Sequence, residues 1–285
     1  MLPLILLLAA APLFAQDKVI YGEDNRLDIV DVESSAWIEV ANSTAVMIAK
    51  TDIPSGGKGR RKTGITISGP TLASRGICPS ERFANQPTVG NCSGFLIDEK
   101  TIVTAGHCMT TPEDCSDFKW AFDYKVEVAG VDSVTLQKNN IYSCKKILKQ
   151  VLDRATQNDF AVIELDRPVT DRVPLKLREA GKVEVGTPLV VIGYPSGLPV
   201  KVAGGAKVRA VREEFFVANL DTYGGNSGSA VLNATTMEVE GILVRGDTDY
   251  VSSPEGCRVS KVQGDDEGRG EDATFITNIK ASLVR

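Results

Sequence analysis

The chain has 285 residues, 42% of them hydrophobic, and its 32 basic and 37 acidic side chains give a formal net charge of −5. This length can bury one large core or two small ones. The acidic balance argues against nucleic acid or an anionic membrane as the main partner, because both attract basic surface. The 26 glycines and 13 prolines favour a turn-rich β protein over one built from long helices.

An apolar stretch opens the chain. Residues 1–15, MLPLILLLAAAPLFA, carry no polar side chain and are shorter than the about 20 residues that a membrane-spanning helix needs. We interpret them as a secretory signal peptide cut after Ala15, although no Lys or Arg lies near Met1. A buried strand or an uncleaved anchor is the alternative. Export predicts a secreted or periplasmic protein with no membrane attachment once the signal is removed.

Residues 16–62 are interpreted as a pro-segment or N-terminal extension that is removed or packs on the body of the protein. The apolar run 44–49 within them predicts a strand. Residues 51–64, rich in Gly, Ser, Lys and Arg, predict a flexible or protease-sensitive loop. The basic run 60–62 is either a processing site or part of a solvated loop. A cut after it would leave residues 63–285 as the folded domain.

Short apolar runs recur between turn residues from about residue 92 onward. They are four to nine residues long and rich in Val, Ile and Phe, which predicts an all-β sandwich or barrel. The Pro-containing stretch 166–186 divides them into two groups. It predicts a connection between a first β subdomain that ends at about residue 166 and a second that spans 187–285.

The C-terminal part adds an acidic loop and a helix. The loop 263–272, QGDDEGRGED, either binds calcium or is simply solvated. Beyond it, Phe275, Ile279 and Leu283 lie four residues apart, which predicts a C-terminal helix docked by one apolar face.

Cysteine usage points to disulfides and away from metal. An even number of cysteines in a chain that begins like an exported protein favours disulfides, and spacing alone does not choose their pairing. None lies in a CxxC pair, and a single histidine leaves too few nitrogen ligands for a mixed zinc site, so we expect no metal. The six cysteines are Cys78, Cys92, Cys108, Cys115, Cys144 and Cys257.

His107, the only histidine, follows a predicted strand in TIVTAGHCMT. Downstream, Asp159 precedes an apolar strand in QNDFAVIEL, and Ser227 lies in the Gly-rich turn DTYGGNSGSA. A serine hydroxyl needs an imidazole to take its proton, and the imidazole needs a carboxylate to fix its tautomer. In that turn the amides of Gly225 and Ser227 can point at one spot and stabilise an oxyanion, at about 3–4 kcal/mol per donor.

In the order His, Asp, Ser, the motifs TAGHC, NDFAVIEL and GGNSGSA resemble those of the chymotrypsin-like (trypsin-fold) serine peptidases. The resemblance covers roughly residues 78–285. It implies two six-stranded antiparallel β-barrels with the catalytic groups in the cleft between them. It also implies a Cys92–Cys108 disulfide that ties the histidine loop to the preceding strand and contributes about 3 kcal/mol.

The same resemblance assigns the chemistry. His107 is implied to be the general base and then the general acid, Asp159 its orienting carboxylate and Ser227 the nucleophile. Gly225 and Ser227 are implied to form the oxyanion hole.

Departures from the family pattern indicate which branch of the family the chain resembles. Asn226 stands where animal digestive members keep the Asp that receives the new N-terminal ammonium, and Tyr223 replaces a disulfide cysteine. The GGNSGS motif and the short Asp-to-Ser interval instead resemble the bacterial branch that includes glutamyl endopeptidases. That branch places a second histidine in its specificity pocket, whereas Leu243 lies near that position here, which argues against glutamate specificity by that route.

Two segments are candidates for substrate contact. Asp221 lies six residues before Ser227, the offset at which trypsin-like members bind Arg or Lys; alternatively it faces solvent or a local Arg. The segment ILVRG resembles the strand that pairs with the substrate, and Arg245 on it either reaches an acidic substrate residue or lies in solvent. The predicted substrate-binding residues are Asp221, Thr222, Val244, Arg245 and Gly246.

The leading hypothesis is therefore a secreted, monomeric serine endopeptidase, made as a zymogen, that cuts protein or peptide substrates through an acyl-enzyme without a cofactor. A catalytically silent binding or regulatory protein on the same fold is the alternative, against which the complete set of motifs argues. Esterase or lipase action predicts an α/β fold with the histidine last, whereas His107 comes first.

Overall fold

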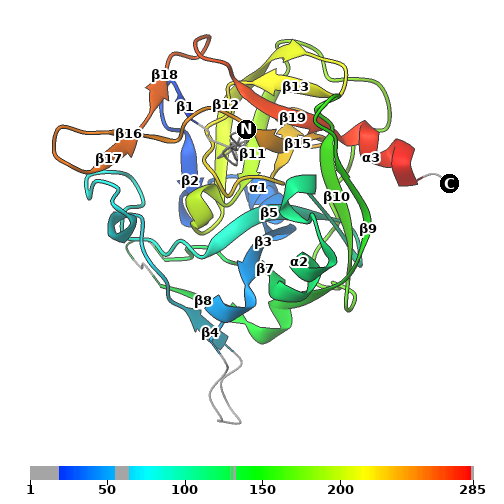
Figure 1. Cartoon of the computed structure of the whole chain (residues 1–285), viewed down its shortest axis with the longest axis horizontal. Helices are drawn as coiled ribbons and strands as arrows, with labels where there is room; N and C mark the ends of the chain where they lie inside the picture. The colour runs from blue at the N-terminus through cyan, green and yellow to red at the C-terminus, as the bar shows by residue number, and fades with distance from the viewer. Residues whose placement is uncertain (1–18, 55–63, 129, 131–132, 284–285) are drawn as a thin grey trace, which may run out of the picture.

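Two β-barrels make up most of the molecule (Figure 1). The computed structural model describes residues 19–54, 64–128, 130 and 133–283. The predicted signal peptide and the basic run 60–62 lie outside these residues. Within them, no helix is both long and apolar enough to cross a membrane.

The first barrel is closed and antiparallel. Its interior is filled by aromatic side chains that are almost fully buried, among them Phe95, Trp120, Phe122 and Phe160. Interior-facing residues alternate with exterior ones along the strands of a barrel, so these large apolar side chains form its core. Its strands, in pairing order, are β10 (Asp159–Leu165), β6 (Thr101–Thr104), β5 (Gly90–Asp98), β3 (Thr44–Ala49), β7 (Phe118–Phe122) and β9 (Ile141–Leu152).

The second barrel closes because β11 pairs with both β14 and β12. Its core includes Leu189, Phe216 and Phe275. Two six-stranded antiparallel barrels, as predicted, are therefore confirmed. The strands, in pairing order, are β11 (Pro188–Gly193), β14 (Ala230–Asn233), β15 (Val239–Arg245), β19 (Glu271–Phe275), β13 (Phe215–Ala218) and β12 (Lys201–Val211).

Few helices accompany the barrels. They are α1 (Ser35–Asn42), α2 (Pro112–Asp117) and the predicted C-terminal helix α3 (Ile276–Leu283), on which Ile279 is buried. The irregular stretch 166–186 joins β10 to β11. The short strands are β1 (Ile20–Tyr21), β2 (Arg26–Asp28), β4 (Gly64–Ile67), β8 (Val134–Gln137), β16 (Tyr250–Ser252), β17 (Arg258–Ser260) and β18 (Val262–Gln263).

The segment predicted to be an extension contributes strands to both barrels. β3 lies between β5 and β7 in the first barrel. β2 adds to the second barrel by pairing with β12, and β1 pairs with β18. The start of the mature domain stays a prediction, but releasing all of residues 16–62 would remove a strand from the closed first barrel.

Asp221 anchors the N-terminal segment to the second barrel. Its Oδ1 accepts a hydrogen bond from the backbone N–H of Tyr21 at 2.8 Å, and its Oδ2 accepts one from that of Asn25, also at 2.8 Å. The side chain is buried, and this burial raises the pKa of Asp221 from 3.8 to about 6. Next to it, the fully buried Arg26 pairs with Asp24.

Because Asp221 is buried, we predict that the stability of the folded protein depends on pH. Between about pH 4 and 6 the folded protein holds a proton on Asp221, with its pKa of about 6, that the unfolded chain has released. Stability therefore falls as the pH rises through this window, by about 3 kcal/mol in total. Asp221→Asn loses a hydrogen bond at every pH but does not titrate. Relative to wild type, its melting temperature should rise between pH 4 and 7.

The matched control is Asp52→Asn, at an exposed site, whose melting temperature should track that of wild type at every pH. A difference between Asp221→Asn and wild type that stays constant from pH 4 to 7 would contradict the prediction.

Candidate active site

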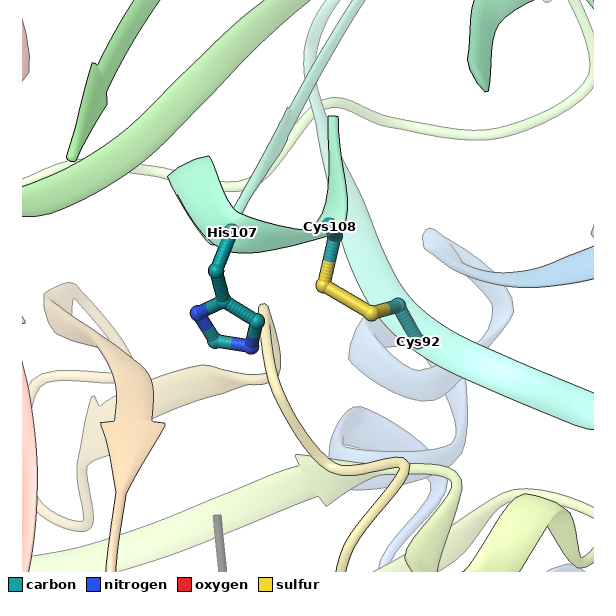
Figure 2. A group of neighbouring side chains, drawn as sticks. All are labelled: Cys92, His107 and Cys108. Carbon is teal, nitrogen blue, oxygen red and sulfur yellow. A yellow bond between two sulfur atoms is a disulfide. The ribbon is translucent and has the colours of Figure 1, made fainter. Parts of the chain in front are cut away.

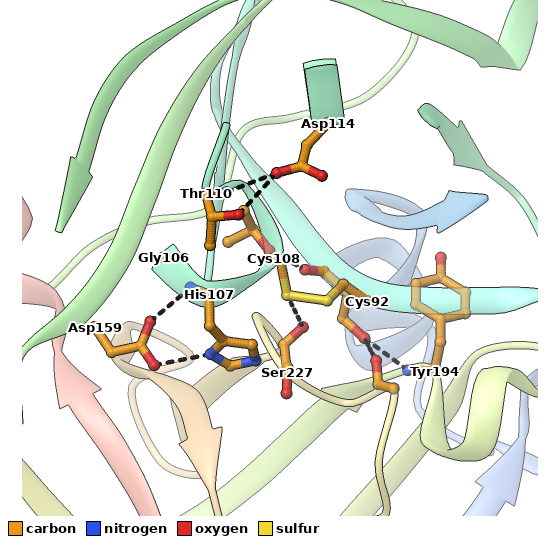
Figure 3. Close-up of a disulfide and its surroundings, with 12 residues drawn as sticks. Cys92, Gly106, His107, Cys108, Thr110, Asp114, Asp159, Tyr194 and Ser227 are labelled. Carbon is orange, nitrogen blue, oxygen red and sulfur yellow. Dashed lines mark hydrogen bonds and ion pairs between the residues drawn. A yellow bond between two sulfur atoms is a disulfide. The ribbon is translucent and has the colours of Figure 1, made fainter. Parts of the chain in front are cut away.

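His107 and Asp159 lie close together where β6 ends and the neighbouring strand β10 begins. His107 lies in the 3-10 turn Gly106–Cys108 that follows β6, and Asp159 is the first residue of the neighbouring β10. The imidazole Nδ1 lies 2.8 Å from Asp159 Oδ2, and the His107 backbone N–H donates to Oδ1 at 3.1 Å. Because the carboxylate engages Nδ1, Nε2 is the ring nitrogen available to a further partner. In Figure 3 the ring lies between Asp159 and Ser227.

Gly106 allows this turn to lie against the neighbouring strands. A Cβ atom there would come within 1.9 Å of the Val151 carbonyl oxygen and 2.8 Å of that of Phe160. The Gly106 carbonyl accepts a hydrogen bond from the Gln150 side chain at 3.1 Å. A side chain at residue 106 would therefore push His107 away from its carboxylate.

Ser227 sits in a tight double turn. The Asn226 N–H donates to the Tyr223 carbonyl at 3.0 Å, and the Ser229 N–H donates to the Asn226 carbonyl at 2.8 Å. Gly225 and Gly228 flank the turn with φ of 90° and 91°, in the left-handed region that favours glycine. Ser227 therefore lies within the second of two consecutive turns, directly after Asn226.

Ser93 joins this turn to the first barrel, a role that the sequence did not suggest. Its hydroxyl donates to the Gly225 carbonyl at 2.8 Å and accepts from the Tyr194 N–H at 3.0 Å. Its own N–H donates to the Ser227 carbonyl at 2.8 Å. Serine side chains form such bridges in many loops, so only its position beside Cys92 offered a signal.

Cys92 and Cys108 form the disulfide that the resemblance implied, directly beside His107 (Figure 2). The Cys108 sulfur also lies 3.8 Å from the Ser227 carbonyl oxygen, which brings the histidine turn against the serine turn. The two cysteines and His107 lie close enough to resemble a metal site. Disulfide sulfurs are not thiolates, however, so this cluster does not suit a metal ion.

The remaining cysteines, whose pairing the sequence left open, form the disulfides Cys78–Cys257 and Cys115–Cys144.

Arg245 is turned toward Asp159 rather than into solvent. Its Nε lies 3.2 Å from the Asp272 carboxylate, and its Nη1 lies 3.9 Å from Asp159 Oδ2. Asp159 is only 1% exposed, so a nearby cation offsets part of the cost of burying its charge. Val244, the preceding residue, is fully buried.

The other predicted substrate residues have partners within the protein. Both carboxylate oxygens of Asp221 bind the N-terminal segment, so the basic-pocket hypothesis loses its free carboxylate. The Thr222 hydroxyl donates to the buried Glu271 at 2.8 Å, and the Gly246 carbonyl accepts from Arg269 at 2.8 Å. In the sequence Glu271 stands out only as part of the acidic loop 263–272.

Comparisons with known proteins agree with the motifs. Residues 92–242 match a family described as "Trypsin-like peptidase domain". A curated relative, the glutamyl endopeptidase of Bacillus licheniformis, is 28% identical over 156 residues, which are 52% of this chain and 47% of the relative. The chain thus matches about half the length of that relative.

Two solved structures share the fold. "Structure of Glu endopeptidase in complex with MPD" aligns with a TM-score of 0.51 and 19% identity, over 94% of this chain and 100% of that one. "Structure of Vibrio cholerae VesB protease" aligns with a TM-score of 0.54 and 12% identity, over 91% of this chain and 66% of that one.

The bridge through Ser93 can be tested by substitution. Ser93→Ala removes both hydrogen bonds of the hydroxyl and leaves the Tyr194 N–H without its acceptor, which should cost about 1–3 kcal/mol of unfolding free energy. Because the Gly225 carbonyl loses its donor, we also expect kcat for peptide hydrolysis to fall about tenfold. Ser116→Ala, at an exposed site, is the control. Unchanged kcat in Ser93→Ala would show that the bridge does not position the turn.

Proposed function

The chain belongs to the family of trypsin-like peptidase domains, and from this premise we propose that it is a serine endopeptidase acting on proteins or peptides. The observation that carries the proposal is the 2.8 Å contact between His107 Nδ1 and Asp159, which leaves Nε2 for the hydroxyl of Ser227. His107 lies in a turn that follows β6 of the first barrel, and Ser227 lies in a turn that precedes β14 of the second barrel.

In the proposed reaction, Ser227 Oγ attacks the carbonyl carbon of the scissile bond while His107 Nε2 takes the hydroxyl proton. Asp159 holds the imidazole tautomer and stabilises the imidazolium that forms. The N–H groups of Gly225 and Ser227 stabilise the oxyanion. His107 then protonates the leaving amine, which departs and leaves an ester on Ser227. Water, deprotonated by His107, hydrolyses this acyl-enzyme.

The described residues match neither the histidine-containing pocket for Glu nor the carboxylate-containing pocket for Arg or Lys. The chain has no second histidine for a glutamate pocket, and Leu243 is buried in β15. The carboxylate of Asp221 is committed to the N-terminal segment, which argues against its use for Arg or Lys. We therefore assign neither Glu nor a basic side chain to the position before the cut bond.

We further propose that the protein is exported and acts as a monomer. Three disulfides link the described cysteines, and such bonds persist in oxidising compartments outside the cytosol. The apolar residues 1–15 would supply the export signal. All the proposed catalytic groups come from one chain, so the reaction needs no second copy.

Active-site labelling tests the proposal. A fluorophosphonate should label the mature protein once, and the label should map to Ser227 because only an activated serine reacts. Ser227→Ala should take no label. Asp159→Asn should keep the fold but lower kcat about 10⁴-fold, because the amide favours the wrong histidine tautomer.

The opposite result favours the silent binding protein. A folded wild-type protein that takes no label and cleaves no peptide from a random library would overturn the proposed function. Labelling that survives in Ser227→Ala would place the nucleophile elsewhere.

A further inference from the structure

A pocket of about 360 Å³ lies beside the oxyanion turn, and of its lining residues only Gly225 has a role in the proposed reaction. Gly224 and Gly225, just before the nucleophile, form one edge of it, and Gly90 at the start of β5 forms another. A peptide held at Ser227 would therefore pass this pocket.

The Cys78–Cys257 disulfide holds together one wall of the pocket, since its neighbours Ile77 and Arg258 both line that pocket. It ties the segment between β4 and β5 to the β16–β17 hairpin. Two backbone hydrogen bonds reinforce it: the Cys78 N–H donates to the Arg258 carbonyl at 2.9 Å, and the Arg258 N–H donates to the Gly76 carbonyl at 2.9 Å. Segments that are far apart in sequence thus form one fixed surface.

This wall carries two arginines. Arg75 and Arg258 both line the pocket, and both are exposed. Each is held in place by a hydrogen bond to a carbonyl, from Arg258 to Arg75 at 2.9 Å and from Arg75 to Thr88 at 2.6 Å. The carboxylate in the lining, Asp249, accepts the Gly224 N–H at 2.9 Å. Formal charge on the lining side chains is therefore positive.

The floor of the pocket is partly apolar. Leu72 and Ile77 are buried and pack with Leu198. At its edge, the hydroxyls of Ser196 and Tyr250 lie 2.8 Å apart. A cationic rim over an apolar floor suits a side chain with methylene groups and a terminal carboxylate.

The position of the pocket indicates which half of a substrate reaches it. The acyl half is expected to pair with β15 at Val244 to Gly246. The pocket is instead lined by Gly224 and Gly225 and by Gly90 and Asn91 of β5, and none of the residues from Val244 to Gly246 lines it. We propose that it binds an acidic side chain at one of the first three positions after the cut bond, so that Glu or Asp there speeds cleavage. This inference rests on the proposed serine endopeptidase function.

Internally quenched peptides test the proposal. Three peptides share the acyl half and carry Ala, Glu or Lys at all three positions after the cut bond. We expect kcat/KM for the Glu peptide to exceed that for the Ala peptide by about three- to tenfold, and that for the Lys peptide to be lowest. Arg75→Gln/Arg258→Gln should bring the Glu peptide to the level of the Ala peptide. Arg212→Gln, at an exposed site, should keep the preference.

An anilide with the same acyl half separates the possible failures, because it places no residue in the pocket. Wild type and the double variant should cleave it equally. If wild type cleaves neither the anilide, nor these peptides, nor any member of the random library, the proposed function fails. If wild type cleaves the anilide and shows no preference for Glu, or if the double variant keeps that preference, the pocket proposal is overturned.

Salt provides a check in wild type that does not depend on how the variants fold. The Debye length falls to about 3 Å at 1 M salt, so the Glu preference should shrink toward unity there. A preference that is undiminished at 1 M salt would contradict recognition by exposed arginines.

Discussion

The proposed catalytic groups come from two barrels, so the position of Ser227 relative to His107 depends on the contact between Ser93 and the serine turn. Its hydroxyl and its N–H bind the Gly225 and Ser227 carbonyls, while the same strand leads into the disulfide beside His107. Within each barrel, the hydrogen-bonded strands of a closed sheet fix the positions of the side chains that they carry. The relative position of imidazole and hydroxyl is then set by a few bonds at the junction, where an error of an ångström would cost much of the rate.

Asp221 shows that sequence position alone does not identify a substrate-binding carboxylate. Asp221 stands at the sequence offset of a substrate-binding carboxylate, yet its oxygens accept the backbone N–H groups of Tyr21 and Asn25 in the N-terminal segment. The segment supplies a strand to each barrel, so it is part of the fold in the described structure. The substrate pocket must therefore be understood together with this segment.

Sequence reasoning reached the two barrels because apolar runs of strand length recur on both sides of residues 166–186. It brought His107, Asp159 and Ser227 into one hypothesis through local motifs. It could not find contacts decided by long-range packing: β3 within the first barrel, or the Cys78–Cys257 pair. The direction of a long polar side chain is equally hidden, because Arg245 can face a substrate, solvent or Asp159 from the same strand position.

Ser227, activated by His107, is proposed to form a covalent acyl-enzyme. Mixing the mature protein with an activated ester and following the first turnover tests this step most directly. We expect a burst of one equivalent of leaving alcohol and an acyl group that peptide mapping locates on Ser227, with no burst in His107→Ala. Two results would contradict this proposal: steady release of the alcohol without a burst and without an acyl adduct, or an acyl adduct on a residue other than Ser227.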